Sequence, residues 1–351
     1  MLTNLTRSRA KTRLPHPRPA DRRATPLRRA TLAGAFGLAA VLGLAPQAEA
    51  KVRVAYGDIA SVENLHLLAA FELAKQKGVE IEMTYLKSED IAAQAVVSGQ
   101  ADVGVGGPYA LIQKVKVPVR IFLQLSTLHF YPAVNAASYK TWKDLDGQEV
   151  AVHSRGSGTE AIMKLMEQRQ GISFSKISYI PGSEVRTGAL LQGNVKATIV
   201  DAAGRRLLEE KAPGKFIILP MDGVNATDEA LFARQDFLDK NAGDVDIIVE
   251  SILTTWREVT ENPAIVAEWR TRYKLLPDLP ADQVAEITPY FTELAEAKAF
   301  PLNGGGAQAA KDDFAFYTLS GQLQGAPASL KVEDFWALEP LNRSLGKLGT
   351  N

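Results

Sequence analysis

Two hydrophobic patterns alternate along the chain from residue 51 onward. Short stretches with apolar residues at every second position predict strands, and longer stretches with apolar residues three and four positions apart predict helices. In the first part of the chain the predicted strands are 51–56, 79–86, 102–105 and 117–125, and the predicted helices are 64–77, 88–98 and one that opens at 106–108. Strands and helices in turn, joined by short connections, indicate a doubly wound α/β fold with a mainly parallel sheet.

The same alternation starts again after a polar, turn-rich stretch at 142–147. The elements predicted there are strands at 149–152, 176–180, 196–200 and 215–219, and helices at 159–170, 184–193 and 205–211. An internal repeat favours two similar lobes, because Ala95–Val103 aligns with Ala189–Ala197 and each has a Ser-Glu pair upstream, Ser88-Glu89 and Ser183-Glu184.

The last part of the chain is predicted to be largely helical. Its amphipathic stretches are 245–260, 265–273, 280–297 and 307–323. We expect these helices to cover the first lobe. The predicted organisation is therefore lobe 1 in 51–145, lobe 2 in 146–238 and a helical return in 239–351.

The first 50 residues differ in composition from the rest. They hold nine Lys/Arg and two acidic residues, then an apolar run at 31–45 and an Ala-x-Ala site before residue 51. This pattern is typical of an export signal removed near Lys51, and Arg28-Arg29 resembles a twin-arginine signal. Residues 51–351 keep 31 of the 40 basic and 38 of the 40 acidic residues, a net charge of −7, which argues against a nucleic-acid partner. With no cysteine in the chain, disulfides, thiolate metal sites and cysteine nucleophiles are excluded. We expect a soluble periplasmic protein.

Candidate ligand contacts follow from the predicted strand ends. In open α/β sheets, ligands bind outside the carboxyl ends of the parallel strands. The first lobe places these residues there: Tyr56, Asp58, Ser88, Gly107, Pro108, Tyr109, Ser126, Thr127 and His129. The second lobe contributes a glycine turn and two acids: Arg155, Gly156, Ser157, Gly158, Thr159, Glu184 and Asp201.

The order of segments resembles a known family. An exported chain carries Ile91–Val105 followed by Gly-Gly-Pro, a second lobe that opens with Trp-Lys-Asp-Leu-Asp-Gly-Gln-Glu-Val-Ala-Val, and a helix at 251–260 that ends in Glu-Asn-Pro. These features resemble the NMT1/THI5-like solute-binding proteins of ABC importers for nitrate, taurine, alkanesulfonates and thiamine-precursor pyrimidines, a family that includes the yeast pyrimidine synthase. The resemblance implies a type II periplasmic-binding-protein fold of two lobes, a ligand cleft closed by hinge motion, and docking on an inner-membrane permease.

The chemistry of the candidates favours capture of a small organic anion. Arg155 can present a planar fork to a sulfonate or carboxylate, with Ser157, Thr159 and free N–H groups of the glycine turn beside it. Ser88, Ser126 and Thr127 would add polar contacts, and Tyr56, Tyr109 and Trp256 an apolar wall. The acids Asp58, Glu184 and Asp201 would matter for a ligand that carries an amine.

Other functions receive less support from the sequence. His66, His129 and His153 have no metal-motif spacing, and no Gly-x-Ser-x-Gly elbow follows a strand. We therefore expect a monomeric binding protein that is not an enzyme and uses no metal or cofactor. A pyrimidine or nitrate-like ligand, a synthase-like activity, and a role as partner of a membrane sensor remain the alternatives.

Overall fold

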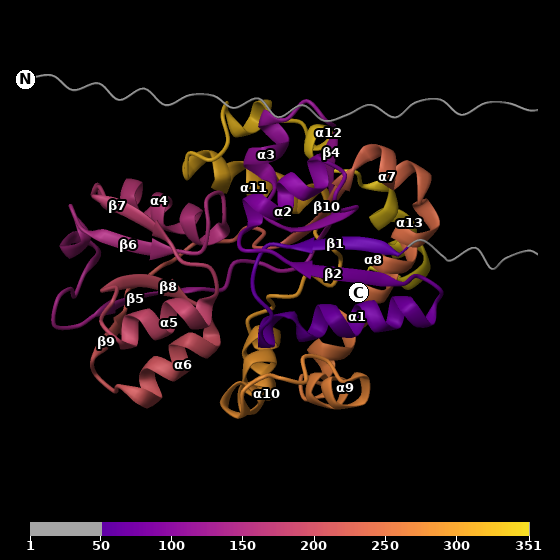
Figure 1. The fold of residues 1–351 in the computed structure, drawn as a ribbon. Helices are drawn as coiled ribbons and strands as arrows, with labels where there is room; N and C mark the ends of the chain where they lie inside the picture. The colour runs from indigo at the N-terminus through magenta and orange to yellow at the C-terminus, as the bar shows by residue number, and fades with distance from the viewer. Residues whose placement is uncertain (1–50, 351) are drawn as a thin grey trace, which may run out of the picture. The chain divides into compact units, whose positions relative to one another are not determined.

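Two five-stranded sheets organise residues 51–350, which are the residues that the computed structural model describes (Figure 1). The predicted export signal lies outside them. The first sheet has the order β2 (Ile81–Tyr85), β1 (Val52–Tyr56), β3 (Val103–Gly106), β10 (Ala230–Arg234) and β4 (Val119–Gln124). The second has the order β7 (Lys176–Tyr179), β6 (Glu149–Val152), β8 (Ala197–Val200), β5 (Tyr131–Asn135) and β9 (Phe216–Ile218). These sheets are the centres of lobe 1 and lobe 2.

The two sheets have the same plan. In each, the first three strands of the order are parallel, and the fourth, β10 or β5, is antiparallel to its neighbours on both sides. The predicted doubly wound α/β architecture with two similar lobes is confirmed, with one antiparallel strand in each sheet.

Each lobe has helices on the faces of its sheet. In lobe 1 they are η1 (Val62–Asn64), α1 (Leu65–Gln76), α2 (Glu89–Val97) and α3 (Tyr109–Lys114). In lobe 2 they are η2 (Trp142–Leu145), α4 (Gly158–Gln170), α5 (Ser183–Leu191) and α6 (Ala202–Lys211). The helices begin close to the residues that the sequence predicts, and Ser157 caps the start of α4 as expected, since its side chain accepts from the Glu160 N–H.

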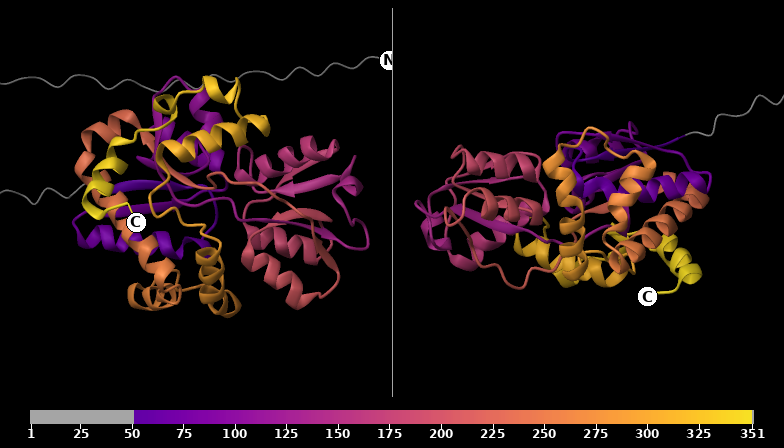
Figure 2. Two further views of the ribbon diagram at one scale, coloured as in Figure 1. Left: turned by 180° about the vertical axis from the view of Figure 1, so that it is seen from behind. Right: turned by 90° about the horizontal axis from the view of Figure 1, so that it is seen from below.

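The C-terminal part returns to lobe 1. It comprises α7 (Gln235–Lys240), α8 (Ala242–Glu261), α9 (Ile265–Tyr273), α10 (Ala281–Glu296), α11 (Gly306–Leu319), η3 (Pro327–Ser329), α12 (Val332–Phe335) and α13 (Glu339–Leu348). Helix α8 packs against α1 and α13, and its Trp256 donates from Nε1 to the Leu125 carbonyl over 2.7 Å. Figure 2 shows these orange and yellow helices around lobe 1. Two of the helices, α10 and α11, also contact α6 and α4 of lobe 2.

The chain changes sheet earlier than the predicted lobe boundaries. Strand β5 already belongs to the second sheet, and β10 already belongs to the first. The crossings therefore lie in 125–130 and 219–229, before residues 146 and 239. Both strands find their hydrogen-bonding partners far away in sequence, so no local pattern marks the sheet to which they belong. That residues 146 and 239 separate units that fold on their own stays a prediction.

No helix within residues 51–350 is long and apolar enough to cross a membrane.

A glycine in β3 gives a test of the packing in lobe 1. A Cβ atom at Gly104 would lie 2.2 Å from Cζ of the Phe232 ring on the neighbouring strand β10. We expect Gly104→Ala to lower the free energy of unfolding by about 1–3 kcal/mol in urea denaturation, because the ring has to shift in a close-packed core. The control is Gly188→Ala in α5, where a Cβ meets nothing within 4 Å and about 0.5–1 kcal/mol should be gained. Equal stability of the two variants would contradict this packing.

Candidate ligand-binding cleft

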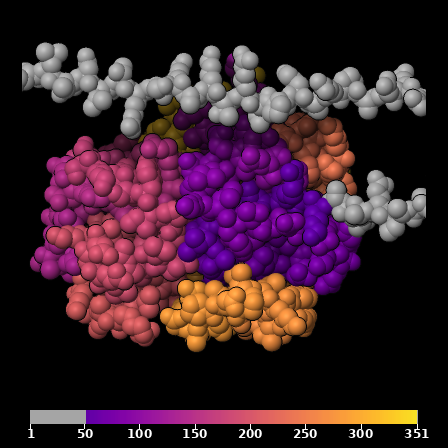
Figure 3. Space-filling model, viewed as in Figure 1, coloured from indigo at the N-terminus to yellow at the C-terminus, as the bar shows by residue number. Residues whose placement is uncertain are grey.

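Two paired segments join the lobes. The Leu128 N–H donates to the Ala226 carbonyl over 2.9 Å, and the Asp228 N–H donates to the Ser126 carbonyl over 2.9 Å. Segments 125–130 and 219–229 thus run side by side where the chain passes between the sheets. A pair of short connections between two lobes is the usual position of a hinge. In the space-filling view the magenta lobe meets the indigo lobe along one seam (Figure 3).

His153 bridges the lobes at the end of β6. Its Nε2 lies 3.0 Å from the Gly57 carbonyl oxygen in lobe 1, and its Nδ1 lies 3.4 Å from the Gly182 N–H in lobe 2. Nε2 donates to this carbonyl, because a carbonyl oxygen only accepts. Burial lowers the pKa of His153, which favours the neutral form of its ring. His153 therefore contacts both lobes at the junction.

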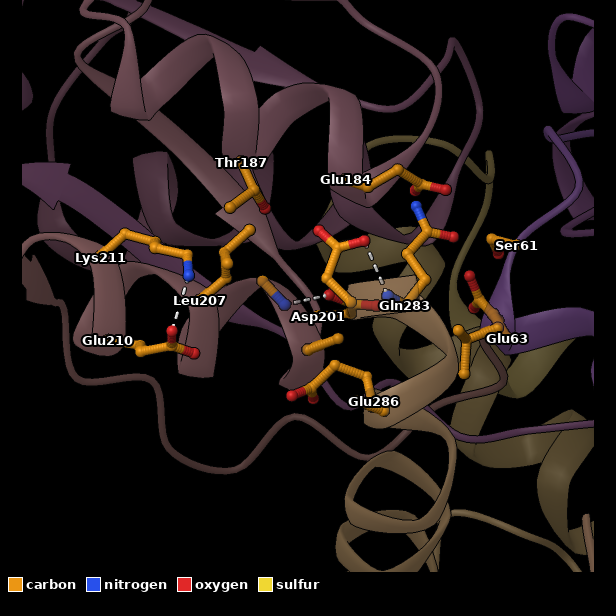
Figure 4. Close-up of a pocket in the computed structure, with 15 residues that line it drawn as sticks. Ser61, Glu63, Glu184, Thr187, Asp201, Leu207, Glu210, Lys211, Gln283 and Glu286 are labelled. Carbon is orange, nitrogen blue, oxygen red and sulfur yellow. Dashed lines mark hydrogen bonds and ion pairs between the residues drawn. The ribbon is translucent and has the colours of Figure 1, made fainter. Parts of the chain in front are cut away.

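A cavity of about 320 Å³ lies between the lobes. Glu63 of η1 borders it from lobe 1, Glu184 of α5 and Asp201 from lobe 2, and Gln283 of α10 from the helical return. Figure 4 shows Glu184 and Asp201 on one side of this cavity and Ser61 and Glu63 on the other. Of the sequence-predicted candidates, Glu184 and Asp201 are therefore placed at the junction of the lobes.

Acidic side chains gather around the junction. We call this set the acidic cluster, and its members are Asp58, Glu63, Glu89, Glu184, Asp201, Asp228 and Glu229. Each of the seven is half-buried. Only three of them, Asp58, Glu184 and Asp201, are among the residues that the sequence nominates.

The carboxylates of the cluster raise one another's pKa. Burial is the largest cause for six members, and repulsion between neighbouring carboxylates adds to it for five of them. For Asp201 burial raises the pKa, whereas its hydrogen bonds and the charges of Arg186 and Arg206 lower it. The pKa values of Glu89 and Glu184 rise to about 7, and those of Glu63, Asp228 and Glu229 rise well above the ordinary value. Keeping these carboxyls ionised therefore has an electrostatic cost, which either a proton or a cation would relieve.

One buried cation, Arg186 of α5, lies among these acids. Its side chain is 2% exposed, and it donates from Nε to the Ile199 carbonyl over 2.9 Å and from Nη1 to the Ile180 carbonyl over 3.0 Å. The charges of Asp58 and Asp201 act on it most strongly. One guanidinium that is already bonded to two carbonyls neutralises only part of a seven-carboxylate cluster.

The nearby cations of α6 have acidic partners of their own. Arg206 contacts Glu286 over 2.9 Å and also Glu293, and Arg205 lies 3.2 Å from Glu293. Lys211 lies 2.6 Å from Glu210. These ion pairs join α6 of lobe 2 to α10 or remain within α6. Of these cations, Arg206 also acts on the cluster, since its charge lowers the pKa of Asp201.

Several polar groups of the glycine turn after β6 have partners within the protein. The Gly156 N–H donates to the Glu160 carboxylate over 2.7 Å. A Cβ at Gly158 would lie 3.0 Å from Oδ1 of Asp228, so an acid from the second crossing already stands beside the start of α4. Ser157 caps the helix, and Thr159 accepts from the His153 N–H over 3.0 Å. The protein's own carboxylates and backbone therefore occupy part of this turn, and its role as an anion site stays a prediction.

Arg155 is exposed at the edge of the turn. Its guanidinium carbon lies 5.2 Å from the centre of the Tyr179 ring. The side chain also borders a second cavity, of about 230 Å³, together with Glu89, Gly107 and Pro108. An anion there would meet the Glu89 carboxylate as well as the guanidinium.

The aromatic wall predicted from the sequence is wrong. Tyr109 is fully buried in lobe 1, where its hydroxyl contacts Asp313 and accepts from Nε1 of Trp336 over 2.9 Å. Tyr56 is 1% exposed and Trp256 is also buried. A periodic pattern identifies the buried face of an element, and these rings occupy that face.

The remaining candidates surround the junction. Ser126, Thr127 and His129 border a third cavity, which Glu63 and Asp201 also line. Oδ2 of Asp58 lies 3.4 Å from Nδ1 of His153. Ser88 precedes α2, does not border this cavity, and donates from its hydroxyl to the Asp90 carboxylate over 2.5 Å.

The internal repeat in the sequence points to Glu89, a member of the acidic cluster that is not among the sequence candidates. Glu89 and Glu184 are the acidic members of the two Ser-Glu pairs, and they occupy the first turns of α2 and α5. The two helices follow corresponding strands of the two sheets, and both carboxyls have pKa values of about 7. The repeat thus predicts two related acids, of which the sequence candidates include only Glu184. For Glu63, Arg186, Asp228 and Glu229 no such signal exists.

The strand order and the junction define a class, the periplasmic-binding-protein fold. A protein from Bordetella bronchiseptica RB50 superposes with a TM-score of 0.69 at 20% identity, over 86% of this chain and 98% of that one. The nitrate-binding protein NrtA from Synechocystis PCC 6803 gives 0.65 at 12% identity, over 86% and 89%. The alkanesulfonate-binding protein SsuA from Xanthomonas axonopodis pv. citri, bound to MOPS, gives 0.58 at 14% identity, over 82% and 98%.

At sequence identities of 12% to 20%, the similarity to these structures is a similarity of fold. The family model described as NMT1/THI5 like matches residues 74–265, and the chain belongs to that family. No curated protein matches the chain.

Proposed function

We propose that the protein is the solute-binding component of an ABC importer, which captures a small solute between its lobes and delivers it to a membrane permease. The observation that carries the proposal is the junction, where two sheets of the same plan are joined by paired segments and border a cavity of about 320 Å³. Lobes joined in this way can close over a ligand by bending at the connections. Membership of the NMT1/THI5-like family supports the same role.

In this role the protein acts as a monomer in the periplasm after export. It binds its solute without covalent chemistry and uses no cofactor. Its membrane partner is an ABC permease.

Cross-linking in intact cells tests this function. We expect the full chain, expressed with its own N-terminal segment, to reach the periplasm and to cross-link to the transmembrane subunits of an ABC importer. A cross-link to a membrane sensor kinase in their place would favour the sensor alternative. Turnover of a substrate by the purified protein would favour an enzyme.

The sequence hypothesis of an anionic ligand held by Arg155 has its own test. We expect Arg155→Ala to change the free energy of unfolding by less than about 1 kcal/mol, because the side chain is exposed and its interaction with Tyr179 is weak. Calorimetric titration with taurine, ethanesulfonate and succinate should give the same result for the variant and the wild type. Binding of one of these probes that disappears in Arg155→Ala would restore the anion hypothesis.

A further inference from the structure

We infer that the cleft takes an organic cation, an amine or amidine whose positive charge is held by the acidic cluster between the lobes. This inference rests on the proposed solute-binding function and names the chemical class of the solute.

The first support is the charge at the junction. Seven half-buried carboxylates face one buried guanidinium, that of Arg186, which is already bonded to two carbonyl oxygens. Around the cavity itself, Lys211 pairs with Glu210. Within the described residues, then, Glu63, Glu184 and Asp201 have no lysine or arginine partner within ion-pair distance. Buried charges are stable when they are paired, and a cationic ligand supplies the missing partner.

The second support is a buried acceptor that is independent of the acids. His66 borders the third cavity, which shares Glu63 and Asp201 with the cavity of about 320 Å³. Its ring is 7% exposed, and its Nδ1 has no hydrogen-bond partner among residues 51–350. Burial lowers the pKa of His66 to about 3, so the ring is neutral and one of its nitrogens can accept a hydrogen bond from a ligand N–H.

The His66 ring packs against the core of lobe 1. Its centre lies 4.5 Å from that of the Trp256 ring and 5.2 Å from that of the Phe300 ring, and both rings are buried core residues. These contacts hold the imidazole in place.

The cavity favours an organic solute of modest size. Its volume of about 320 Å³ is at the lower end of the range for small-molecule sites. Val62, Ala203 and Leu207 line it beside the carboxylates. Apolar walls with a few fixed charges suit a short carbon chain that bears amino or amidine groups.

The surroundings of the N-terminus of α4 argue against an anionic ligand. This N-terminus is the feature best suited to an anion, and its surroundings are already occupied by the carboxylates of Glu160 and Asp228. An anionic ligand would bring further negative charge to a region that holds an excess of it.

A probe panel and matched variants test the inference. The full chain is expressed, and the protein is recovered from the periplasm. Its melting temperature is measured with putrescine, agmatine, spermidine and choline, and with taurine, ethanesulfonate, succinate and nitrate. We expect at least one amine or amidine probe to raise the melting temperature and none of the anions to do so.

The dissociation constant of the best probe is then measured for three variants. Glu184→Gln and Asp201→Asn keep side-chain size, and Asn still caps α6. We expect each to weaken binding roughly tenfold or more, through loss of a half-buried charge partner. The matched control is Glu210→Gln, which borders the same cavity but is exposed and paired with Lys211, and it should bind within about twofold of wild type.

Each outcome has a defined meaning. Binding of an anionic probe, or amine binding that both Glu184→Gln and Asp201→Asn leave unchanged, overturns the cation assignment and leaves the solute-binding function standing. Stabilisation by Mg²⁺ or Ca²⁺ alone also overturns it. If the protein binds no probe of either charge and cross-links to no permease, both the cation assignment and the proposed solute-binding function are contradicted.

Discussion

Replacing Arg186 by methionine is expected to lower the free energy of unfolding by about 3–5 kcal/mol, which is typical when one partner of a buried charge set is removed. The guanidinium donates to the carbonyls of Ile199 and Ile180 and is the buried cation closest to the acidic cluster. Without it the carboxylates repel one another unopposed, and two carbonyl oxygens lose their donor. Urea denaturation followed by circular dichroism measures the loss.

The pH dependence of that loss separates charge from packing. At pH 5 several carboxyls of the cluster are protonated because their pKa values are raised, so Arg186→Met should cost less there than at pH 8. Arg186→Lys keeps the charge without the planar fork and should lie between the variant and the wild type. The control is Arg169→Met on the exposed face of α4, for which we expect a change within about 1 kcal/mol. An Arg186→Met protein as stable as wild type at pH 8 would contradict this role.

Ligand-free protein is expected to lose stability as the pH rises from 6.5 to 8. Glu89 and Glu184 have pKa values of about 7 in the folded state, whereas a glutamate in the unfolded chain titrates near its ordinary value of about 4.3. Between those values the folded state binds more protons than the unfolded state, so the free energy of unfolding falls with rising pH. Linkage gives a fall of about 1 kcal/mol for each of the two glutamates over this window.

The window is chosen so that histidines do not interfere. His66 and His153 have lowered pKa values, and their contribution to stability rises with pH only up to the unfolded value of about 6.5. Denaturation curves at pH 6.5, 7.25 and 8 should show the decline. The double variant Glu89→Gln, Glu184→Gln should make it shallower by about 1 kcal/mol for each glutamate, and a residual slope should remain because the pKa values of Glu63, Asp228 and Glu229 are also raised. Glu210→Gln should leave the slope unchanged. A stability that is constant or rises over this window would contradict the electrostatic description of the cleft.

The repeated architecture is predictable because its signals are local. Strands and helices such as 102–105 and 88–98 follow from periodicity over a few residues, and their order indicates two similar α/β lobes. Strands β5 and β10 are different. Each completes a sheet whose other strands lie mostly in another part of the sequence, so its membership depends on long-range pairing that a local pattern does not contain.

The candidate site is predictable only in position. Strand-end loops do meet at the junction, and Glu184 and Asp201 lie at its central cavity. The sign of the charge, however, depends on residues that approach from distant segments. Gly156 and Gly158 indicate an anion site in the sequence, whereas the folded chain brings Asp228 from the second crossing to the same place. The aromatic candidates failed for a related reason, since apolar pattern alone does not distinguish a cavity wall from the core.

A calorimetric titration with an amine tests the central claim most directly. The probe that gives the largest rise in melting temperature is titrated at pH 7 in two buffers of different ionisation enthalpy. A cation held by the acidic cluster lowers the pKa of Glu184 and its neighbours, so binding should release protons, and the apparent enthalpy should differ between the buffers in that sense. The result that would contradict the account is a cleft that binds no amine and instead takes up protons as it binds a sulfonate or carboxylate.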